Sequence, residues 1–211
     1  MILGISASGR KNRIVSQTVK AILESTGLEY EFITLAGKRI SGCIGCTQCA
    51  SDNLCKLNDD WNEIGEKMLK SKAIVFGAPN YYATINALGH ACLERTFSFR
   101  HRGVFSLENK IGVSVSTSRN NSENDPVQAM IQRFMLSNKM NVIGHVAAEG
   151  YDQCYTCGFG HDCDVGNVVR KYGVLEKIEK EHYPPDFVEQ DQTLRQVHKI
   201  AELLRNQLAI A

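Results

Sequence analysis

Four of the eight cysteines lie within thirteen residues of each other, in the stretch GCIGCTQCASDNLCKLNDDW, with the spacing C-x2-C-x2-C-x5-C. Structural zinc sites mostly use two cysteine pairs separated by about a dozen residues or more, whereas here both short spacers share Cys46. Three thiolates at every third residue can instead bind three corners of a 4Fe-4S cube, and a fourth closes it. The spacing favours such a cluster on Cys43, Cys46, Cys49 and Cys55, with zinc or redox-active thiols as alternatives.

A second group of cysteines repeats part of this spacing later in the chain. Cys154, Cys157 and Cys163 are separated by two and then five residues, and His161 lies between the last two. Three thiols and an imidazole can form a zinc site or part of the ligand set of a second cluster. Redox-active thiols, thiols that contact substrate and a structural role are the alternatives. Cys92 belongs to neither group and is expected to be a small buried apolar residue of a helix.

A loop rich in serine, glycine and basic residues follows the first apolar segment. The order MILGIS, ASGRKNR, IVSQTVKAILEST predicts a strand, a turn and a helix. Backbone N–H groups, hydroxyls and the positive end of the helix dipole in such a turn can bind an anion. The loop matches neither G-x4-G-K-[ST] nor G-x-G-x-x-G. Candidate ligands for a terminal phosphate, such as that of FMN, are Ser6, Ser8, Arg10 and Asn12; ordinary helix capping is the alternative.

Two further loops follow apolar segments and supply groups that suit a planar ring with polar edges. GAPNYYATINA contains two adjacent tyrosines, Tyr81 and Tyr82, and STSRNNSEND is rich in hydrogen-bond donors. A tyrosine taken alone is more often a packing residue, so the prediction depends on the convergence of all three loops. The polar candidates in these two loops are Asn80, Thr84, Ser116, Ser118, Arg119 and Asn120.

Such loops converge when the strands before them end at one edge of a sheet. Five short apolar segments, MILGIS, YEFITL, AIVFGAP, KIGVSVST and MNVIGHVA, alternate with segments of helical periodicity. This pattern is typical of a parallel sheet covered by helices on both faces. We predict an α/β, flavodoxin-like, doubly wound sheet of five parallel strands in the order 2-1-3-4-5. Ligands bind beyond the carboxyl ends of such strands, so the cysteine loop at 42–58 is expected near the phosphate loop.

The length of 211 residues predicts a single domain. A cysteine-rich insertion at about 147–185 interrupts the alternation of strands and helices. The later segment DFVEQDQTLRQVHKIAELLRNQL predicts an amphipathic helix that covers the last strand. One domain with two cysteine-containing loops is therefore expected.

The composition excludes several classes of partner. A formal net charge of +1 argues against nucleic acid or a membrane surface. The apolar run at 73–79 is too short to span a bilayer, and MILGISASGRK lacks the pattern of a signal peptide. A cytoplasmic location, where thiols stay reduced, is expected. The basic stretch Arg100, His101, Arg102 is expected to be a solvated turn, with docking of an acidic electron donor as the alternative.

The chain resembles the iron-sulfur flavoproteins of methanogens and other anaerobes, a branch of the NADPH-dependent FMN reductase group with a flavodoxin-like fold. The resemblance covers roughly residues 1–146. It rests on the stretches GISASGRK, CIGCTQCASDNLCKLNDDW, AIVFGAPNYYATINALGHACLERT and NKIGVSVSTSRN. The compact four-cysteine motif is the specific part, because a fold match alone does not define a function.

The resemblance also implies a set of cofactor contacts. It places a 4Fe-4S cluster on the first cysteine group and the FMN phosphate on Ser6, Ser8 and Arg10. The residues that it implies along the isoalloxazine ring are Pro79, Asn80, Tyr81 and Tyr82. Those that it implies at the other polar edge of the ring are Ser116, Thr117, Ser118 and Arg119. Homodimers or homotetramers that bring cluster and flavin together across subunits are implied as well.

These features predict an electron-transfer flavoenzyme that needs no side chain as nucleophile or base. The resemblance implies that electrons from a ferredoxin-like donor pass singly through the cluster to FMN, and then to a small acceptor such as oxygen, peroxide, a quinone or another small oxidant. One alternative is an NAD(P)H-dependent FMN or quinone reductase whose cysteine loop binds zinc or is structural. Another is a redox-sensing carrier that reports oxidation to a partner protein.

Overall fold

The computed structural model of the chain describes residues 1–119 and 125–210. Parallel strands form a central sheet in the order β2-β1-β3-β5-β6, so the predicted flavodoxin-like order is confirmed. A short strand that the sequence did not indicate, β4, pairs antiparallel with the end of β3. The strands are β1 (Ile2–Ser6), β2 (Tyr30–Thr34), β3 (Ala73–Tyr81), β4 (Thr84–Ile85), β5 (Ile111–Ser118) and β6 (Asn141–Glu149).

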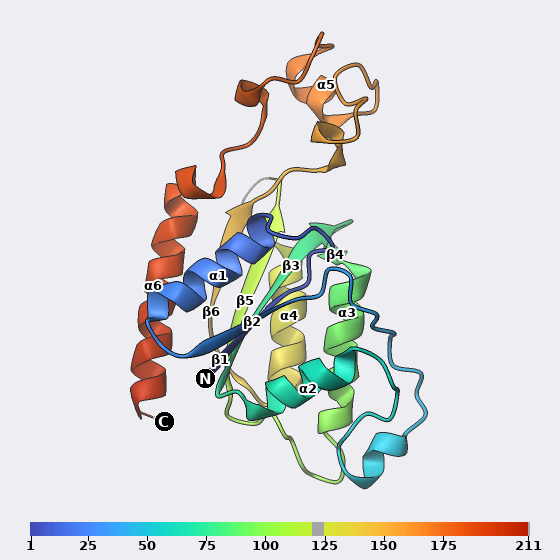
Figure 1. The fold of residues 1–211 in the computed structure, drawn as a ribbon, viewed down its shortest axis with the longest axis vertical. Helices are drawn as coiled ribbons and strands as arrows, with labels where there is room; N and C mark the ends of the chain where they lie inside the picture. The colour runs from blue at the N-terminus through green and yellow to red at the C-terminus, as the bar shows by residue number, and fades with distance from the viewer. Residues whose placement is uncertain (120–124, 211) are drawn as a thin grey trace.

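Helices cover both faces of the sheet (Figure 1). The first face packs against α1 (Ile14–Thr26) and α6 (Asp191–Ile210). The second packs against α2 (Trp61–Lys70), α3 (Ala87–Glu94) and α4 (Pro126–Ser137). The short helix α5 (Asn167–Tyr172) lies apart, in a segment that extends past the carboxyl edge of the sheet in Figure 1. The 3-10 turns are η1 (Gln48–Ser51), η2 (Arg95–Phe99), η3 (Gln153–Tyr155), η4 (Lys180–His182) and η5 (Phe187–Glu189).

The two faces divide the apolar side chains of each strand by alternation. In β3, Ile74 and Phe76 pack with Trp61 on the side of α2 to α4, and Val75 packs with Val19 on the side of α1. Because both faces are covered, apolar residues predominate in the central strands, although β5 also contains the buried Ser114 and Ser116. Within the described residues, every helix is too short or too polar to cross a membrane.

One glycine sets how closely α1 approaches the sheet. A Cβ atom built on Gly77 of β3 would lie 2.7 Å from Val19 Cγ2 and 2.9 Å from Val15 Cγ1. Both neighbours are β-branched and hold a single rotamer in a helix, so they cannot turn aside. The N-terminal turn of α1, which borders the first loop, therefore rests directly on β3.

Replacing Gly77 with Ala should lower the free energy of unfolding by about 1–3 kcal/mol, because the added methyl group pushes α1 away from the sheet. The matched control is Gly9→Ala, since a Cβ atom at Gly9 meets open space. That variant should change the free energy of unfolding by less than about 0.5 kcal/mol. Urea unfolding followed by circular dichroism measures both. Equal midpoints for Gly77→Ala and the wild type would contradict the close packing of α1.

Candidate functional site

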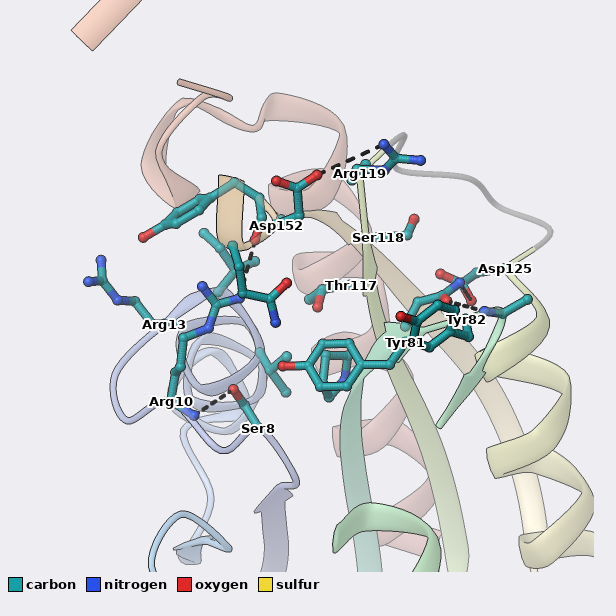
Figure 2. Close-up of a pocket in the computed structure, with 18 of the residues that line it drawn as sticks. Ser8, Arg10, Arg13, Tyr81, Tyr82, Thr117, Ser118, Arg119, Asp125 and Asp152 are labelled. Carbon is teal, nitrogen blue, oxygen red and sulfur yellow. Dashed lines mark hydrogen bonds and ion pairs between the residues drawn. The ribbon is translucent and has the colours of Figure 1, made fainter. Parts of the chain in front are cut away.

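A cavity of about 690 Å³ lies at the carboxyl edge of the sheet, where three strand-to-helix loops meet (Figure 2). This volume falls within the range of about 300–1,000 Å³ that is usual for small-molecule sites. The residues predicted from the sequence that line it are Ser8, Arg10, Pro79, Asn80, Tyr81, Tyr82, Thr117, Ser118 and Arg119. The three loops thus converge as expected, although the role of each residue stays a prediction.

The first loop gives the cavity a positive wall. Arg10 and Arg13 line it beside the N-terminus of α1, whose first turn contains no acidic residue. The backbone N–H of Arg10 donates to Ser8 Oγ at 3.2 Å, which fixes the turn. Two guanidinium groups and the positive helix end make this wall suitable for a phosphate.

Two residues predicted for the phosphate lie elsewhere. Ser6 is fully buried, and its hydroxyl lies 2.9 Å from Ser16 Oγ, inside the fold. Asn12 adopts a left-handed backbone with φ of 54° and lines a neighbouring cavity instead. The sequence pattern marks the loop correctly, but it does not show which side chains of the loop point outward.

The loop after β3 forms the aromatic wall of the cavity, and it is a tight hairpin. β3 turns into β4 at Tyr82 and Ala83, which both have left-handed backbones with φ of 55° and 60°. Asn80 holds the turn, because its Oδ1 accepts from the N–H of Ala83 at 2.9 Å. Figure 2 shows Tyr81 extending across the cavity toward Ser8 and Arg10, and Tyr82, which also lines the cavity, is fully exposed. Thr84 lies outside the cavity lining, in β4.

The loop after β5 contributes fewer groups to the cavity than the sequence predicted. Thr117, Ser118 and Arg119 line the cavity, whereas Ser116 is buried with its Oγ 3.2 Å from His145 Nε2. Asn120 lies outside the described residues. Ser116 therefore contacts the last strand rather than the cavity.

Several lining residues escaped the sequence patterns, among them Arg13, Asp125, Tyr151, Asp152 and Asn167. Asp125 caps α4 by accepting from the N–H of Val127 at 2.8 Å, and it also accepts from Asn80 Nδ2 at 3.0 Å. The X-Asp-Pro start of a helix is a signal that could have found it. The residues after β6 carry no such signal, because their segment has no regular periodicity.

Tyr151 organises the positive wall. Its carbonyl oxygen accepts from Arg10 Nη2 at 3.2 Å. The guanidinium carbons of Arg10 and Arg13 lie 5.4 and 5.8 Å from the centre of its ring, within the range of cation–π contacts. The ring is in turn packed edge-on against Tyr155 and Tyr183. Tyr151 therefore holds two arginines that repel each other on one side of the cavity.

The four clustered cysteines surround a separate small concavity of about 40 Å³. In Figure 1 their loop runs down beside α2 and α3, toward the end of the sheet opposite the large cavity. The expectation that this loop lies near the phosphate loop is wrong for a single chain. The loop starts at the carboxyl edge but is long enough to cross to the far end of α3.

Three of these cysteines are held by residues at the end of α3 and just after it. Glu94 Oε2 accepts from the N–H of Cys43 at 2.9 Å, and Arg95 Nε donates to Cys55 Sγ at 3.2 Å. Cys49 Sγ lies 3.0 Å from Nε2 of His101. Burial raises the pKa of the Cys49 thiol. The expected solvated turn at 100–102 is thus only partly solvated, because its histidine contacts a candidate ligand.

The second cysteine group has a looser arrangement. Cys154 Sγ accepts from the N–H of Asn167 and Cys157 Sγ from that of Phe159, each at 3.4 Å. His161 Nε2 lies 3.7 Å from Asp162 Oδ1. Its ring forms no hydrogen bond with a thiol of the described residues. Among the described residues, no three Cys, His, Asp or Glu side chains of either group are arranged to hold a metal ion. Both metal assignments therefore stay predictions.

Comparison with known proteins agrees with this layout. Residues 1–153 match the family described as NADPH-dependent FMN reductase. An iron-sulfur flavoprotein of Methanocaldococcus jannaschii is 36% identical over 149 residues, covering 68% of this chain and 75% of its own. One from Methanosarcina thermophila is 32% identical, covering 68% of this chain and 76% of its own. The chain belongs to the iron-sulfur flavoprotein branch of the NADPH-dependent FMN reductase family. It is an FMN-dependent oxidoreductase.

Solved structures with low sequence identity show that this flavoprotein shares its fold with other flavin-binding proteins. RosB, with 8-demethyl-8-formylriboflavin-5'-phosphate bound, aligns with a TM-score of 0.63 at 13% identity, over 99% of this chain and 79% of its own. The NAD(P)H:acceptor oxidoreductase FerB from Paracoccus denitrificans aligns with a TM-score of 0.53 at 15% identity, over 99% and 97%. Both comparisons concern the fold alone.

FMN suits the cavity of this oxidoreductase. Arg10, Arg13 and the N-terminus of α1 offer the charge and N–H donors that a terminal phosphate needs. Tyr81 and Tyr82 offer aromatic surface for a planar ring, and Thr117 offers a hydroxyl for its polar edge. When bound, FMN would supply the capacity to take and give electrons one or two at a time. The side chains bind and orient it.

Replacing Tyr151 with Leu should weaken FMN binding about fivefold, because the two arginines lose a cation–π contact worth about 1 kcal/mol. Tyr151→Phe keeps the ring and should bind FMN like the wild type. Riboflavin, which lacks the phosphate, should bind all three proteins equally. Fluorescence titration of the apoprotein measures each dissociation constant. Equal losses for FMN and riboflavin in Tyr151→Leu would show that Tyr151 only shapes the cavity.

The buried imidazole beside Ser116 should make stability depend on pH. Burial lowers the pKa of His145 to about 4 from its ordinary 6.5. Between these values the unfolded chain binds a proton that the folded chain does not, so the free energy of unfolding should fall as the pH drops from about 6.5 toward 4. His145→Gln should reduce this slope. Urea unfolding at several pH values tests it, and identical slopes for both proteins would contradict the assignment.

Proposed function

We propose that this oxidoreductase takes electrons singly from a ferredoxin-like donor through a 4Fe-4S cluster on the first cysteine group, and delivers them by way of FMN to a small acceptor. The main support is the way in which the chain presents those thiols. All four line one concavity, and all four are free cysteines. Groups at the end of α3 and in the turn after it contact three of them.

The chemistry around the thiols suits a cluster. When bound, a 4Fe-4S cluster would supply one-electron transfer, and its thiolate ligands carry negative charge that nearby donors stabilise. Arg95 provides such a donor to Cys55, and Nε2 of His101 lies 3.0 Å from Cys49 Sγ, where the tautomer protonated at Nε2 would donate as well. Burial opposes the charge on Arg95, but Asp59 and Cys55 together raise its pKa, so it stays a cation. The buried guanidinium would thus stabilise the charged form of a ligand.

The separation of the two sites favours transfer between subunits. The cysteine concavity and the large cavity share no lining residue, and they lie toward opposite ends of the sheet. Exposed apolar side chains lie in the cysteine loop and beside it, because Ile44 and Phe97 are both exposed and both line the concavity. Such a patch is suited to contact with another protein surface. We therefore include in the proposal a homodimer or homotetramer that brings this loop to the flavin cavity of a partner.

A second candidate is an NAD(P)H-dependent FMN or quinone reductase whose cysteine loop binds zinc or is structural. The family description, NADPH-dependent FMN reductase, favours it. The lack, among the described residues, of a side-chain arrangement ready to hold a metal ion favours the structural form of this loop over the zinc-binding form. A redox-sensing carrier is the third alternative. A stable cluster without turnover, and with partner binding that changes on oxidation, would identify it.

The deciding experiment is anaerobic purification followed by assay of iron, acid-labile sulfide, zinc and FMN. About four iron and four sulfide per chain, with about one FMN, would support the proposal. Iron in excess of this would indicate a second cluster on the later cysteines. Zinc without iron, together with rapid bleaching of the flavin by NADPH, would support the reductase instead.

Cys49→Ala should lose the iron and, with it, the reduction of FMN by reduced ferredoxin. Cys92→Ala is the matched control, because Cys92 is buried in α3 and belongs to neither cysteine group. The control should keep both iron and ferredoxin-dependent reduction. Because the flavin cavity shares no residue with the cysteine concavity, both variants should retain FMN. Normal reduction of FMN by ferredoxin in Cys49→Ala would exclude the proposed route.

A further inference from the structure

A second chamber of about 590 Å³ opens beside the flavin cavity. The two adjoin each other, because Arg119, Gly150, Tyr151, Asp152 and Asn167 line both. The far wall of the chamber comes from α5 and from Pro184. These parts of the chain follow residue 153, where the match to the reductase family ends. Half of the residues that line the chamber therefore come from the segment beyond the family match, namely Tyr155, Asn167, Arg170, Lys171 and Pro184.

The charges that face the chamber favour an anion. Its cations are Arg119, Arg170 and Lys171, and its acids are Glu149 and Asp152. Asp152 is occupied by internal contacts, because it accepts from the N–H of Cys154 at 3.0 Å and from Asn167 Nδ2 at 2.6 Å. Glu149 is partly buried, and this burial raises the pKa of its carboxyl. With three cations against two acids, the chamber keeps a net positive charge even when both acids are ionised.

Arg170 is the clearest unbalanced charge. Its side chain forms no ion pair with any residue that the structure describes. Lys171, its neighbour, has its ammonium group 4.8 Å from the ring centre of Tyr172, which leaves it charged. Arg119 reaches Asp152 only at 3.9 Å and is more than half exposed. A carboxylate, sulfonate or phosphate in the chamber would meet guanidinium and ammonium donors.

The rest of the lining is aromatic and firmly held. Tyr151 and Tyr155 both line the chamber, with ring centres 5.9 Å apart in an edge-to-face contact. The hydroxyl of Tyr183 donates to the carbonyl oxygen of Tyr155 at 2.8 Å. Gln190 anchors the start of the segment, since its side chain accepts from the N–H of Glu149 and donates to the Glu149 carbonyl, each at 2.9 Å. Such a wall suits the face of a planar ring.

We propose that this chamber binds the acidic group of an aromatic electron acceptor whose ring reaches the flavin, so that the acceptor of the enzyme is an aromatic anion. The inference rests on the proposed function. For a quinone of this class, two electrons from the ferredoxin-like donor, passed by way of FMN, and two protons from solvent give the hydroquinone. Arg170 and Lys171 take no part in that reduction. They bind the acid and thereby select the acceptor.

The test compares 1,4-naphthoquinone-2-sulfonate with neutral 1,4-naphthoquinone, both bound to the oxidised holoenzyme without reductant. In the double variant Arg170→Gln/Lys171→Gln, the dissociation constant of the sulfonate should rise about tenfold, because two cations at the chamber are lost. That of the neutral quinone should change less than twofold. Lys177→Gln is the matched control, since Lys177 lies in the same segment but pairs with Glu179 outside the chamber.

Equal losses for both quinones, or no loss for the sulfonate, would overturn the inference. The binding measurement needs no turnover, so it is independent of the electron route. A charge-selective loss of binding, in an enzyme that ferredoxin cannot reduce, would support the chamber and reject the proposed function. In an enzyme that ferredoxin does reduce, the same loss should appear as a raised KM for the sulfonate with an unchanged kcat.

Discussion

The parallel pairing of β1, β3 and β5 is the constraint on which the flavin site depends. Strands that run in one direction release their following loops at one edge, and this brings distant parts of the sequence together. The register adds depth to the site. β1 ends at Ser6, opposite Gly77, whereas β3 continues past this level to Tyr81 and Pro79 still pairs with Thr117 of β5. Because β1 ends before β3 and β5 do, the loop after β1 begins further back along the sheet than the loops after β3 and β5. The cavity lies in the space that this difference leaves.

α3 connects the two candidate sites mechanically. At its start, Asn86 Nδ2 donates to the carbonyl oxygen of Ala7 in the first loop at 2.7 Å. At its end, Arg95 is fully buried and pairs with Asp59 at 2.7 Å. An unpaired charge at such a position would cost roughly 3–5 kcal/mol, so the chain around Asp59 must remain where the guanidinium holds it. The end of the cysteine loop at Asp59 is thereby fixed relative to the helix whose start contacts the first loop at Ala7.

The sequence could predict what depends on local pattern and on strand order. The alternation of strands and helices predicted the fold, and the loops after β1, β3 and β5 were correctly expected to meet. Side-chain direction was beyond reach: Ser6 and Ser116 turn inward because a one-residue step in a strand changes the face. The position of the cysteine loop also escaped, because it depends on a contact with Arg95 far along the chain. β4 was missed because a two-residue strand has no period to detect.

Most of the segment after β6 lies beyond the family match. The sheet and its loops fall within the family match, whereas Arg170 and Lys171 do not. Tyr151 belongs to both parts: it holds Arg10 and Arg13 toward the flavin phosphate side and forms the wall of the added chamber. We therefore expect the Tyr151 ring to affect both the binding of FMN and the choice of acceptor. Because that ring is supported by Tyr155 and Tyr183, a change at either tyrosine should alter both properties together, whereas a change at Arg170 or Lys171, which line only the chamber, should alter acceptor choice alone.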